Sequence, residues 1–155
     1  MAKGPPQPPR IVNRKARYNF ELLETLEAGI ALTGSEVKSL RAGRASLDEA
    51  YAFIRSGELF LLDCHISPYP NAGYAQHDPV RPRKLLVHRR ELKRLLAKVT
   101  QKGLTLVPLS LHFSERGLVK VDVALVRGKT HGDKRETIRR REQQREVDRE
   151  LRRRR

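Results

Sequence analysis

The C-terminal 27 residues, 129–155, constrain the fold most, because their only apolar side chains are Ile138, Val147 and Leu151. The same stretch carries twelve Lys and Arg against six Asp and Glu, a net charge of +6. So few apolar groups cannot bury enough surface to offset the entropy lost on ordering. We therefore expect a basic tail that is disordered or only conditionally helical. The globular fold must then be built by the residues that precede it.

Positive charge is concentrated at the two ends of the chain. Residues 1–17 hold five basic groups and no acid, whereas residues 18–128 hold sixteen basic and twelve acidic groups, within a total net charge of +15. Cationic ends on a mildly basic body favour a nucleic-acid partner, because each Lys or Arg placed on a phosphate releases condensed counterions. An anionic membrane surface is the alternative polyanion.

Several classes of protein are disfavoured by the composition. No run of about 18 apolar residues is present, so no helix is expected to span a bilayer. The N-terminus has no apolar h-region, which argues against secretion. Cys64 is the single cysteine, which excludes an internal disulfide and a cysteine-based zinc site. We expect a cytoplasmic protein that holds no metal or cofactor and does not bind a membrane.

The first third of the chain predicts an extended leader, a strand and a short helix. Residues 1–12 are rich in proline and are expected to form a disordered leader. The pattern of residues 18–32 is typical of a strand. Thr33 and Glu36 then have the spacing of a capping box, which predicts a helix that ends before Gly43.

The remainder of the body predicts two hairpins and a second helix. Residues 50–54 and 59–62 form one expected hairpin, and residues 104–113 and 118–126 form the other, with one buried face in its second strand. Between them, Leu92, Leu95, Leu96 and Val99 follow the spacing of one helix face. These elements predict a mainly β fold: an OB-like antiparallel barrel over residues 13–128, with two or three flanking helices.

Patterns that would indicate catalysis are weak. Glu21, Glu24 and Glu27 lie three apart in an expected strand, and this spacing does not place them on one face. The five His residues form no helical pair and no His-Glu-x-x-His pattern, so a metal site would need ligands from separate segments. We expect Cys64 to be a small core residue. The chain is therefore interpreted as a protein that is not an enzyme.

A cluster of basic side chains surrounds the apolar step at residues 85–87. Its members are Arg81, Arg83, Lys84, Arg89 and Arg90. Such a cluster could follow a phosphate backbone, although a solubilising rim has the same pattern. His88 begins the basic helix, either as a polar residue at its N-terminus or as an RNA contact. Because Trp and the ribonucleoprotein motif are absent, we favour recognition of a folded RNA by shape over readout of stacked bases.

The tail has a pattern that permits a helix without securing one. Three acid–base pairs have helical spacing: Glu136 and Arg140, Glu142 and Arg145, and Glu146 and Arg149. Each such pair stabilises a helix by only about 0.2–0.5 kcal/mol. This pattern is expected of a segment that folds when it binds.

Seven blocks of sequence, in order along the chain, resemble the SsrA-binding protein family (small protein B). They are NRKAR (13–17), EAGI (27–30), GSEVKSLRAG (34–43), HISPY (65–69), DPVRPRKLL (78–86), KGLTLVPL (102–109) and DKR (133–135). The resemblance implies an OB-like barrel that binds the tRNA-like domain of transfer-messenger RNA at its elbow. It also implies a role in trans-translation, the rescue of stalled ribosomes. A general nucleic-acid-binding barrel and an RNA-processing factor are the alternatives.

The resemblance and the basic clusters together define the expected RNA contacts. The set is Arg14, Lys15, Arg17, Tyr18, Glu27, Arg83, Lys84, Leu86 and His88. By similarity to the family, Glu27, Leu86 and His88 match positions implicated in RNA contact. The family often has His at the position of Tyr18 and Asn at that of His88, so these two contacts differ in their chemistry here.

The same resemblance assigns residues 129–155 to the ribosome. The family's tail enters the empty mRNA channel near the small-subunit decoding region and becomes helical there. The expected tail contacts are Lys129, His131, Asp133, Lys134, Arg135, Val147 and Leu151. The family usually has His directly before the Asp, whereas this chain has Gly132, with His131 one place earlier. Either His131 takes that role or the contact is missing. We expect a monomer in the complex.

Overall fold

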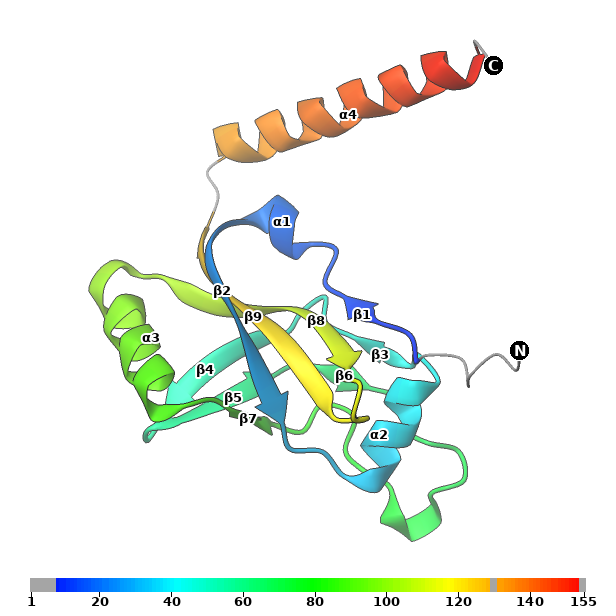
Figure 1. The fold of residues 1–155 in the computed structure, drawn as a ribbon, viewed down its shortest axis with the longest axis vertical. Helices are drawn as coiled ribbons and strands as arrows, with labels where there is room; N and C mark the ends of the chain where they lie inside the picture. Colours follow the sequence, from blue (N-terminus) through cyan, green and yellow to red (C-terminus); the bar gives the residue numbers. More distant parts are fainter. Residues whose placement is uncertain (1–7, 129–130, 154–155) are drawn as a thin grey trace.

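The computed structural model describes residues 8–128 and 131–153, with the side chains of residues 101–102 and 131–138 left out of the description (Figure 1). The elements in chain order are β1 (Ile11–Val12), α1 (Ala16–Asn19), β2 (Phe20–Ile30), α2 (Gly34–Arg41), β3 (Ala45–Ser46), β4 (Tyr51–Arg55), β5 (Glu58–Leu62), β6 (His65–Ile66), the short 3-10 helix η1 (Gly73–Ala75), β7 (Arg83–Leu86), α3 (Arg89–Lys102), β8 (Thr105–Phe113), β9 (Val119–Gly128) and α4 (His131–Arg153).

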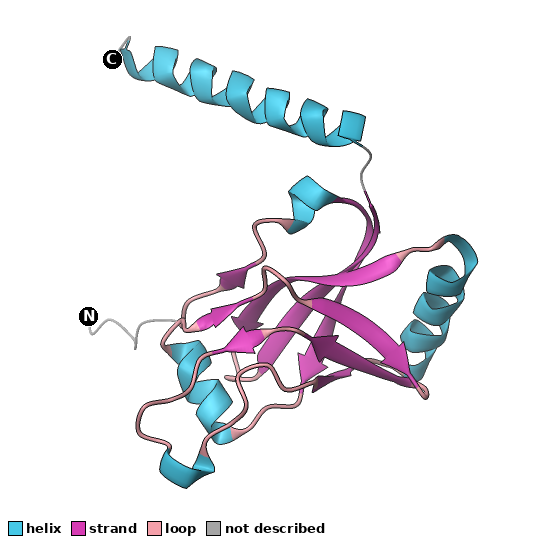
Figure 2. Ribbon diagram, turned by 180° about the vertical axis from the view of Figure 1, so that it is seen from behind, coloured by secondary structure: helices cyan, strands magenta, loops and turns pink. Residues whose placement is uncertain are grey.

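Six strands form a closed ring in which every pairing is antiparallel. The order is β8-β4-β5-β7-β2-β9, and a further pairing between β9 and β8 closes the ring. β1 adds to β8 from outside, and β3 pairs with β6 separately. α2 and α3 lie at different sides of this ring (Figure 2). The prediction of a mainly β, antiparallel fold with flanking helices is confirmed.

The ring encloses a core of aliphatic side chains. Leu59, Leu61, Leu85, Val121 and Val123 are among the fully buried members, and they come from alternate positions of β5, β7 and β9. This alternation confirms the expected buried face of the second hairpin, because successive side chains of a strand point to opposite faces.

A second cluster covers the outer face of β8 and β9. Ala16, Val107, Ala124 and Val126 are buried together, with α1 placed over β8 and β9. β9 is therefore buried on both faces near its C-terminal end, whereas the sequence predicted one buried face. The difference arises because α1 was not expected: Tyr18 belongs to this short helix, and the strand begins only at Phe20.

The fold begins earlier than the expected domain boundary at residue 13. Ile11 and Val12 pair with Leu111 and Ser110 of β8, and Arg10 Nη2 lies 2.8 Å from Asp122 Oδ2. Residues 10–12 of the expected leader therefore contact the body in the structure. Residues 1–7 lie outside the described residues.

The three acids of β2 are distributed among different partners. A β-bulge lies between Leu22 and Glu24, and Glu21 pairs with Arg127 at 3.0 Å. Glu24 instead meets α3, where Lys98 Nζ lies at 2.6 Å and Arg94 Nη2 at 2.5 Å. The hydrogen bond from Lys98 is the largest influence on the pKa of Glu24 and holds it below its ordinary value. The ion pairs of Glu24 with Arg94 and Lys98 therefore hold α3 against the ring of strands.

A buried ion pair joins α2 to β7. The side chains of Glu36 and Arg83 are both 0% exposed, and Arg83 Nε donates to Glu36 Oε2. Glu36 Oε1 accepts from the backbone N–H of Thr33 at 2.9 Å, which completes the predicted capping box, and from Arg81 Nη2 at 2.5 Å. Arg83 Nη1 also donates to the carbonyl of Cys64 at 2.6 Å.

Protonation of these buried groups is set by opposing effects. Burial alone would raise the pKa of Glu36, but hydrogen bonds from Arg81, Thr33 and Arg83 outweigh it, so the pKa is lowered. Burial raises the pKa of the Cys64 thiol to about 11. Cys64 is fully buried in the core, which confirms its interpretation as a small core residue. None of the described helices has the length and apolar character needed to cross a membrane.

Replacing Glu36 with Gln should lower the free energy of unfolding by about 3–5 kcal/mol, because Arg83 would keep its charge in the core without a counterion. Urea denaturation at pH 7 would measure this. The matched control is Glu58→Gln, which removes an exposed partner of Lys84 and should change stability by only about 0–1 kcal/mol. Equal effects of the two substitutions would contradict the role assigned to the buried pair.

Glu36 should also contribute to acid unfolding. Because its folded-state pKa lies below the ordinary 4.5, its stabilising contribution is present above that pH and is lost as the pH falls toward the lowered value. The difference in stability between the protein and its Glu36→Gln variant should therefore shrink below about pH 4.5.

Candidate nucleic-acid interface

Three expected RNA contacts lie close together where β2 meets β7. Gly29 is the cross-strand partner of Leu86, and a Cβ atom at Gly29 would lie 3.3 Å from Leu86 Cβ. Because Gly29 has no side chain, the side chain of Leu86 can lie over β2 at this point. Leu86 is 52% exposed. Glu27 is two residues before Gly29 on the same outward face. His88 is the exposed N-cap residue of α3, which confirms that it begins the basic helix.

Lys84 and Arg83 point to opposite faces of β7. Lys84 is exposed, and its Nζ lies 3.2 Å from Glu58 Oε1. Arg83 is buried and donates to Glu36 and to the carbonyls of Cys64 and Pro79. Arg83 was expected among the RNA contacts, but in the structure this side chain has no exposed surface and its charge is paired inside the fold. The sequence could not show which of Arg83 and Lys84 is buried. Both are basic neighbours in one strand, and only the face of the strand that each occupies differs.

A second group of titratable side chains borders this surface. His112 Nε2 lies 3.4 Å from Glu27 Oε2, and His112 Nδ1 lies 3.5 Å from Asp122 Oδ2. The ligand atoms of these three residues lie within 4.8 Å of one another, which is the cross-segment arrangement that a metal site would need. Asp122 Oδ2, however, already accepts from Arg10 Nη2 at 2.8 Å and from Ser110 Oγ at 2.7 Å. The guanidinium of Arg10 therefore supplies, at Asp122, the positive charge that a metal ion would otherwise supply.

The other expected RNA contacts lie at the opposite end of β2. Arg14 and Lys15 precede α1, and Arg17 and Tyr18 lie within it. Lys15 Nζ is 3.3 Å from Glu49 Oε1, at the surface. At about 3.3 Å per residue, the path along β2 from Phe20 to Gly29 is roughly 30 Å. The structure therefore divides the expected contacts into two groups, one at each end of this strand.

The tail forms a long helix with little contact to the body. The 23 residues of α4 correspond to a length of about 35 Å. Every described side chain of α4, from residue 139 to 153, is exposed, and the contact with the body is at α1, where the Arg141 guanidinium lies 5.9 Å from the centre of the Tyr18 ring. α4 projects away from the ring of strands (Figure 1). The sequence predicted a tail that is disordered or becomes helical on binding, whereas residues 131–153 are already helical in the structure of the chain alone, and the described side chains from residue 139 to 153 are exposed.

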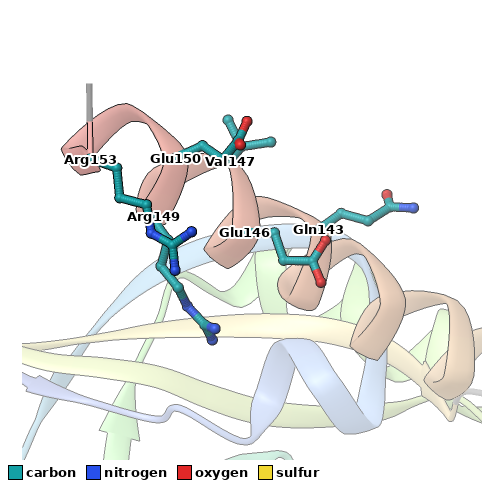
Figure 3. Close-up of a pocket in the computed structure, with 6 residues that line it drawn as sticks. All are labelled: Gln143, Glu146, Val147, Arg149, Glu150 and Arg153. Atoms are coloured by element: carbon teal, nitrogen blue, oxygen red, sulfur yellow. The ribbon is translucent and has the colours of Figure 1, made fainter.

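The expected tail contacts are described only in part. Lys129 lies outside the described residues, and His131, Asp133, Lys134 and Arg135 fall in the part of α4 whose side chains are not described. Val147 and Leu151 are 53% and 60% exposed and lie four residues apart on one side of the helix. Figure 3 shows Val147 and Arg149 pointing to different sides of α4. The hollow drawn there is lined by side chains of α4 alone, so it is no enclosed cavity.

The acid–base pairs expected from spacing are not what holds this part of α4. Among the described side chains of α4, neither Glu142 with Arg145 nor Glu146 with Arg149 forms an ion pair. A hydrogen bond from Gln144 Nε2 to Asp148 Oδ1, at 3.1 Å, is present instead. The charges of Glu142, Arg145, Glu146 and Arg149 are therefore not neutralised within these expected pairs.

One feature of the surface was missed by the sequence reasoning. Phe53 and Phe60 are cross-strand partners on the outward face of β4 and β5, and Phe53 is 51% exposed. The alternation in the first hairpin contains the signal, because Tyr51, Phe53 and Arg55 occupy one face of a strand whose other face holds the buried Ala52.

An antiparallel ring of strands that carries exposed cations at both ends of one strand, together with an exposed basic helix, is typical of small nucleic-acid-binding proteins. A family model described as "SmpB protein" matches residues 10–153. The chain therefore belongs to the SmpB protein family.

Individual relatives are similar over nearly their whole length. The chain is 57% identical to the SsrA-binding protein of Moorella thermoacetica over 140 residues, which cover 90% of each chain. It is 51% identical to the SsrA-binding protein of Trichodesmium erythraeum, with 97% of this chain and 98% of the relative covered. A solved chain described as "tmRNA-SmpB: a journey to the center of the bacterial ribosome" is 53% identical, with a TM-score of 0.68, and covers 85% of this chain and 96% of its own length.

Replacing Lys84 with Ala should weaken RNA binding and reduce the slope of log affinity against log salt by about one unit, because one phosphate contact would be lost. Filter binding or fluorescence anisotropy at several salt concentrations would measure both quantities. Lys38→Ala is the matched control, because Lys38 is an exposed lysine of α2 that lies over the ring of Tyr69. A salt slope that is unchanged in Lys84→Ala would place Lys84 outside the interface.

Proposed function

We propose that this protein is an RNA-binding adaptor for the rescue of stalled ribosomes by trans-translation. It binds the tRNA-like domain of transfer-messenger RNA, promotes its delivery to the stalled ribosome and places its C-terminal tail in the empty mRNA channel. The observation that carries this proposal is the 53% identity to a solved chain described with tmRNA and the bacterial ribosome. The name SsrA-binding protein, shared by relatives that match about nine-tenths of the chain, supports the same partner.

The body, residues 13–128 with the short segment that precedes it, is assigned to the RNA. Contacts at both ends of β2 would touch a folded RNA at points roughly 30 Å apart. Two such points select a ligand by its shape, because an RNA must present suitable groups at both places at once. Arg14, Lys15 and Arg17 supply phosphate contacts at the α1 end. Lys84, Leu86 and His88 act at the β7 end, with Glu27 beside them.

The tail, residues 129–155, is assigned to the ribosome. A helix about 35 Å long, in a segment of net charge +6, fits a channel bordered by phosphates. Messenger RNA in the same channel would exclude it, since both occupy the groove that the phosphates form. The tail therefore senses whether the channel is vacant. The contacts proposed for it are Lys129, His131, Asp133, Lys134 and Arg135, with Val147 and Leu151 as an apolar pair.

The protein is proposed to act by positioning, without chemistry of its own. The one described cluster that resembles a metal site, Glu27 with His112 and Asp122, has the cationic group of Arg10 on its carboxylate. The thiol of Cys64 is buried and its pKa is raised, which disfavours the nucleophilic thiolate. We assign the protein to the cytoplasm, where its ribosomal partner works, as a monomer within the complex.

Deleting the residues after Gly128 should leave most of the affinity for transfer-messenger RNA while abolishing the rescue of stalled ribosomes, because the two parts have separate partners. RNA affinity and peptide tagging on ribosomes stalled at a truncated messenger would be measured in parallel. Loss of RNA affinity on deletion would contradict the division of labour.

A variant of the full chain tests whether rescue needs the helical conformation of α4 or only its positive charge. Gln144→Pro interrupts the middle of α4 without changing the net charge, and a proline in a helix interior costs about 3 kcal/mol or more. It should reduce rescue, whereas the control Gln144→Ala should not. Equal rescue by both variants would show that charge alone is sufficient.

Labelled transfer-messenger RNA incubated with the purified protein and magnesium should remain intact, because the proposed role needs no bond to be broken. Gel electrophoresis over several hours would measure this. Cleavage that disappears in a Glu27→Ala variant would instead establish an RNA-processing enzyme at the Glu27, His112 and Asp122 cluster.

A further inference from the structure

An exposed row of side chains runs across three strands of the ring. Phe53 of β4 lies opposite Phe60 of β5, and Phe60 lies opposite Lys84 of β7. Residues directly opposite each other on neighbouring antiparallel strands have Cβ atoms about 4.5–5.5 Å apart. We call Phe53, Phe60 and Lys84 the aromatic row. Two rings and an ammonium group are thus held side by side on the outside of the ring of strands.

Phe53 and Phe60 of the aromatic row line a shallow hollow of about 420 Å³, and Lys84 lies next to Phe60 on the neighbouring strand. The apolar lining of the hollow comes from Phe53, Phe60, Leu62 and Pro82, and its polar rim from Arg55 and Glu58. Pockets that hold small planar ligands have volumes of about 300–1,000 Å³. The hollow therefore suits one or two planar groups and is small for a helix or strand of a protein partner.

The hollow is continuous with the proposed RNA surface. Lys84 and Leu86 are two residues apart on the outward face of β7, and Leu86 meets Gly29 of β2. An RNA that contacts Leu86 and the N-terminus of α3 therefore passes directly beside the aromatic row. Glu58 Oε1 and Lys84 Nζ form an ion pair at 3.2 Å that is about half exposed, so Lys84 must exchange this partner for a phosphate when RNA binds. Arg55 adds a cation at the other side.

We propose that the aromatic row is a binding subsite for one unpaired base of the RNA, which stacks on Phe53 and Phe60 while Lys84 holds an adjacent phosphate. This inference rests on the proposed function and adds to it. Every base has a π-face, so aromatic rings on an exposed sheet accept an unstacked base whatever its sequence, with a neighbouring cation on the backbone. The body then recognises the folded RNA by shape and fixes its position with one extruded nucleotide.

The subsite predicts that rings, and not only apolar volume, are required. A full-length variant with Phe53→Leu and Phe60→Leu should bind a transcript of the tRNA-like domain about 5- to 150-fold more weakly, the loss expected when one stacked base is released. A variant with Phe53→Tyr and Phe60→Tyr should retain most of the affinity. Because no phosphate contact is removed, the salt slope should stay unchanged in both variants, in contrast to Lys84→Ala.

The matched control is Tyr74→Leu, since Tyr74 is an aromatic residue of η1 that is fully exposed and lies outside the hollow. This variant should bind the transcript like the unmodified protein. Thermal unfolding of each variant establishes that its fold is intact.

Ultraviolet cross-linking of the unmodified protein tests the same subsite and does not depend on the folding of a variant. Irradiation of its complex with the same transcript at ultraviolet wavelengths should link a nucleotide to the peptides that contain Phe53 or Phe60, as identified by mass spectrometry. Links confined to other peptides would overturn the subsite.

The outcomes separate this proposal from the one on which it rests. If the unmodified protein binds duplex DNA as tightly as the tRNA-like transcript at the same salt concentration, the proposed function fails. If it prefers the transcript and the double Leu variant binds equally well, only the subsite is overturned. A double Leu variant that keeps its RNA affinity but loses association with ribosomes would assign the hollow to a protein partner, which also overturns the proposal.

Discussion

The ion pair between Glu36 and Arg83 determines which side chains the body presents to a partner. Arg83 begins β7 and is held inside the fold by Glu36 and by carbonyls of the loop over residues 63–82. Because side chains alternate along a strand, a slip of one residue would exchange the two faces of β7. Anchoring Arg83 inside therefore places Lys84 and Leu86 outside. A buried ion pair is poor evidence for net stability, but it is well suited to fixing such a register.

The same pair shows why part of the site could be predicted from sequence and part could not. The capping box at Thr33 and Glu36 was predicted from local spacing, because its partners are three residues apart. The second role of Glu36 involves an arginine 47 residues away, and no local pattern reports it. Arg83 and Lys84 look equivalent in a basic cluster. The long-range partners of β7, which are Glu36 and strand β5, assign Arg83 to the core and Lys84 to the surface.

The aromatic row illustrates a different limit of sequence reasoning. The hairpin that contains Phe53 and Phe60 was predicted, and alternation alone places Tyr51 and Phe53 on one face. Apolar residues are ordinarily assigned to the buried face, yet here Ala52, Leu59 and Leu61 fill the interior and the rings lie outside. The sequence did contain a signal of outward-facing rings, because the small residue Ala52 lies between Tyr51 and Phe53 and faces inward. Its meaning depends on the closed ring, in which Ala52 is buried and Phe53 faces outward.

The helical tail requires a different balance of forces from the body. Its described side chains are exposed, so burial of apolar surface contributes little to its helicity. A helix held mainly by its own backbone hydrogen bonds is marginal and remains in exchange with disordered conformations. Such a tail has two advantages for the proposed entry into a narrow channel. It can unfold to pass, and its helical conformation, already populated, lowers the entropy lost when it binds. The contact between the Arg141 guanidinium and the Tyr18 ring is weak by itself, because a cation over a ring near the surface contributes only about 0.5–1 kcal/mol. The contact also brings α4 next to the residues of α1 that we propose to bind RNA, so the proposed tail site and the proposed RNA surface meet at the same few side chains.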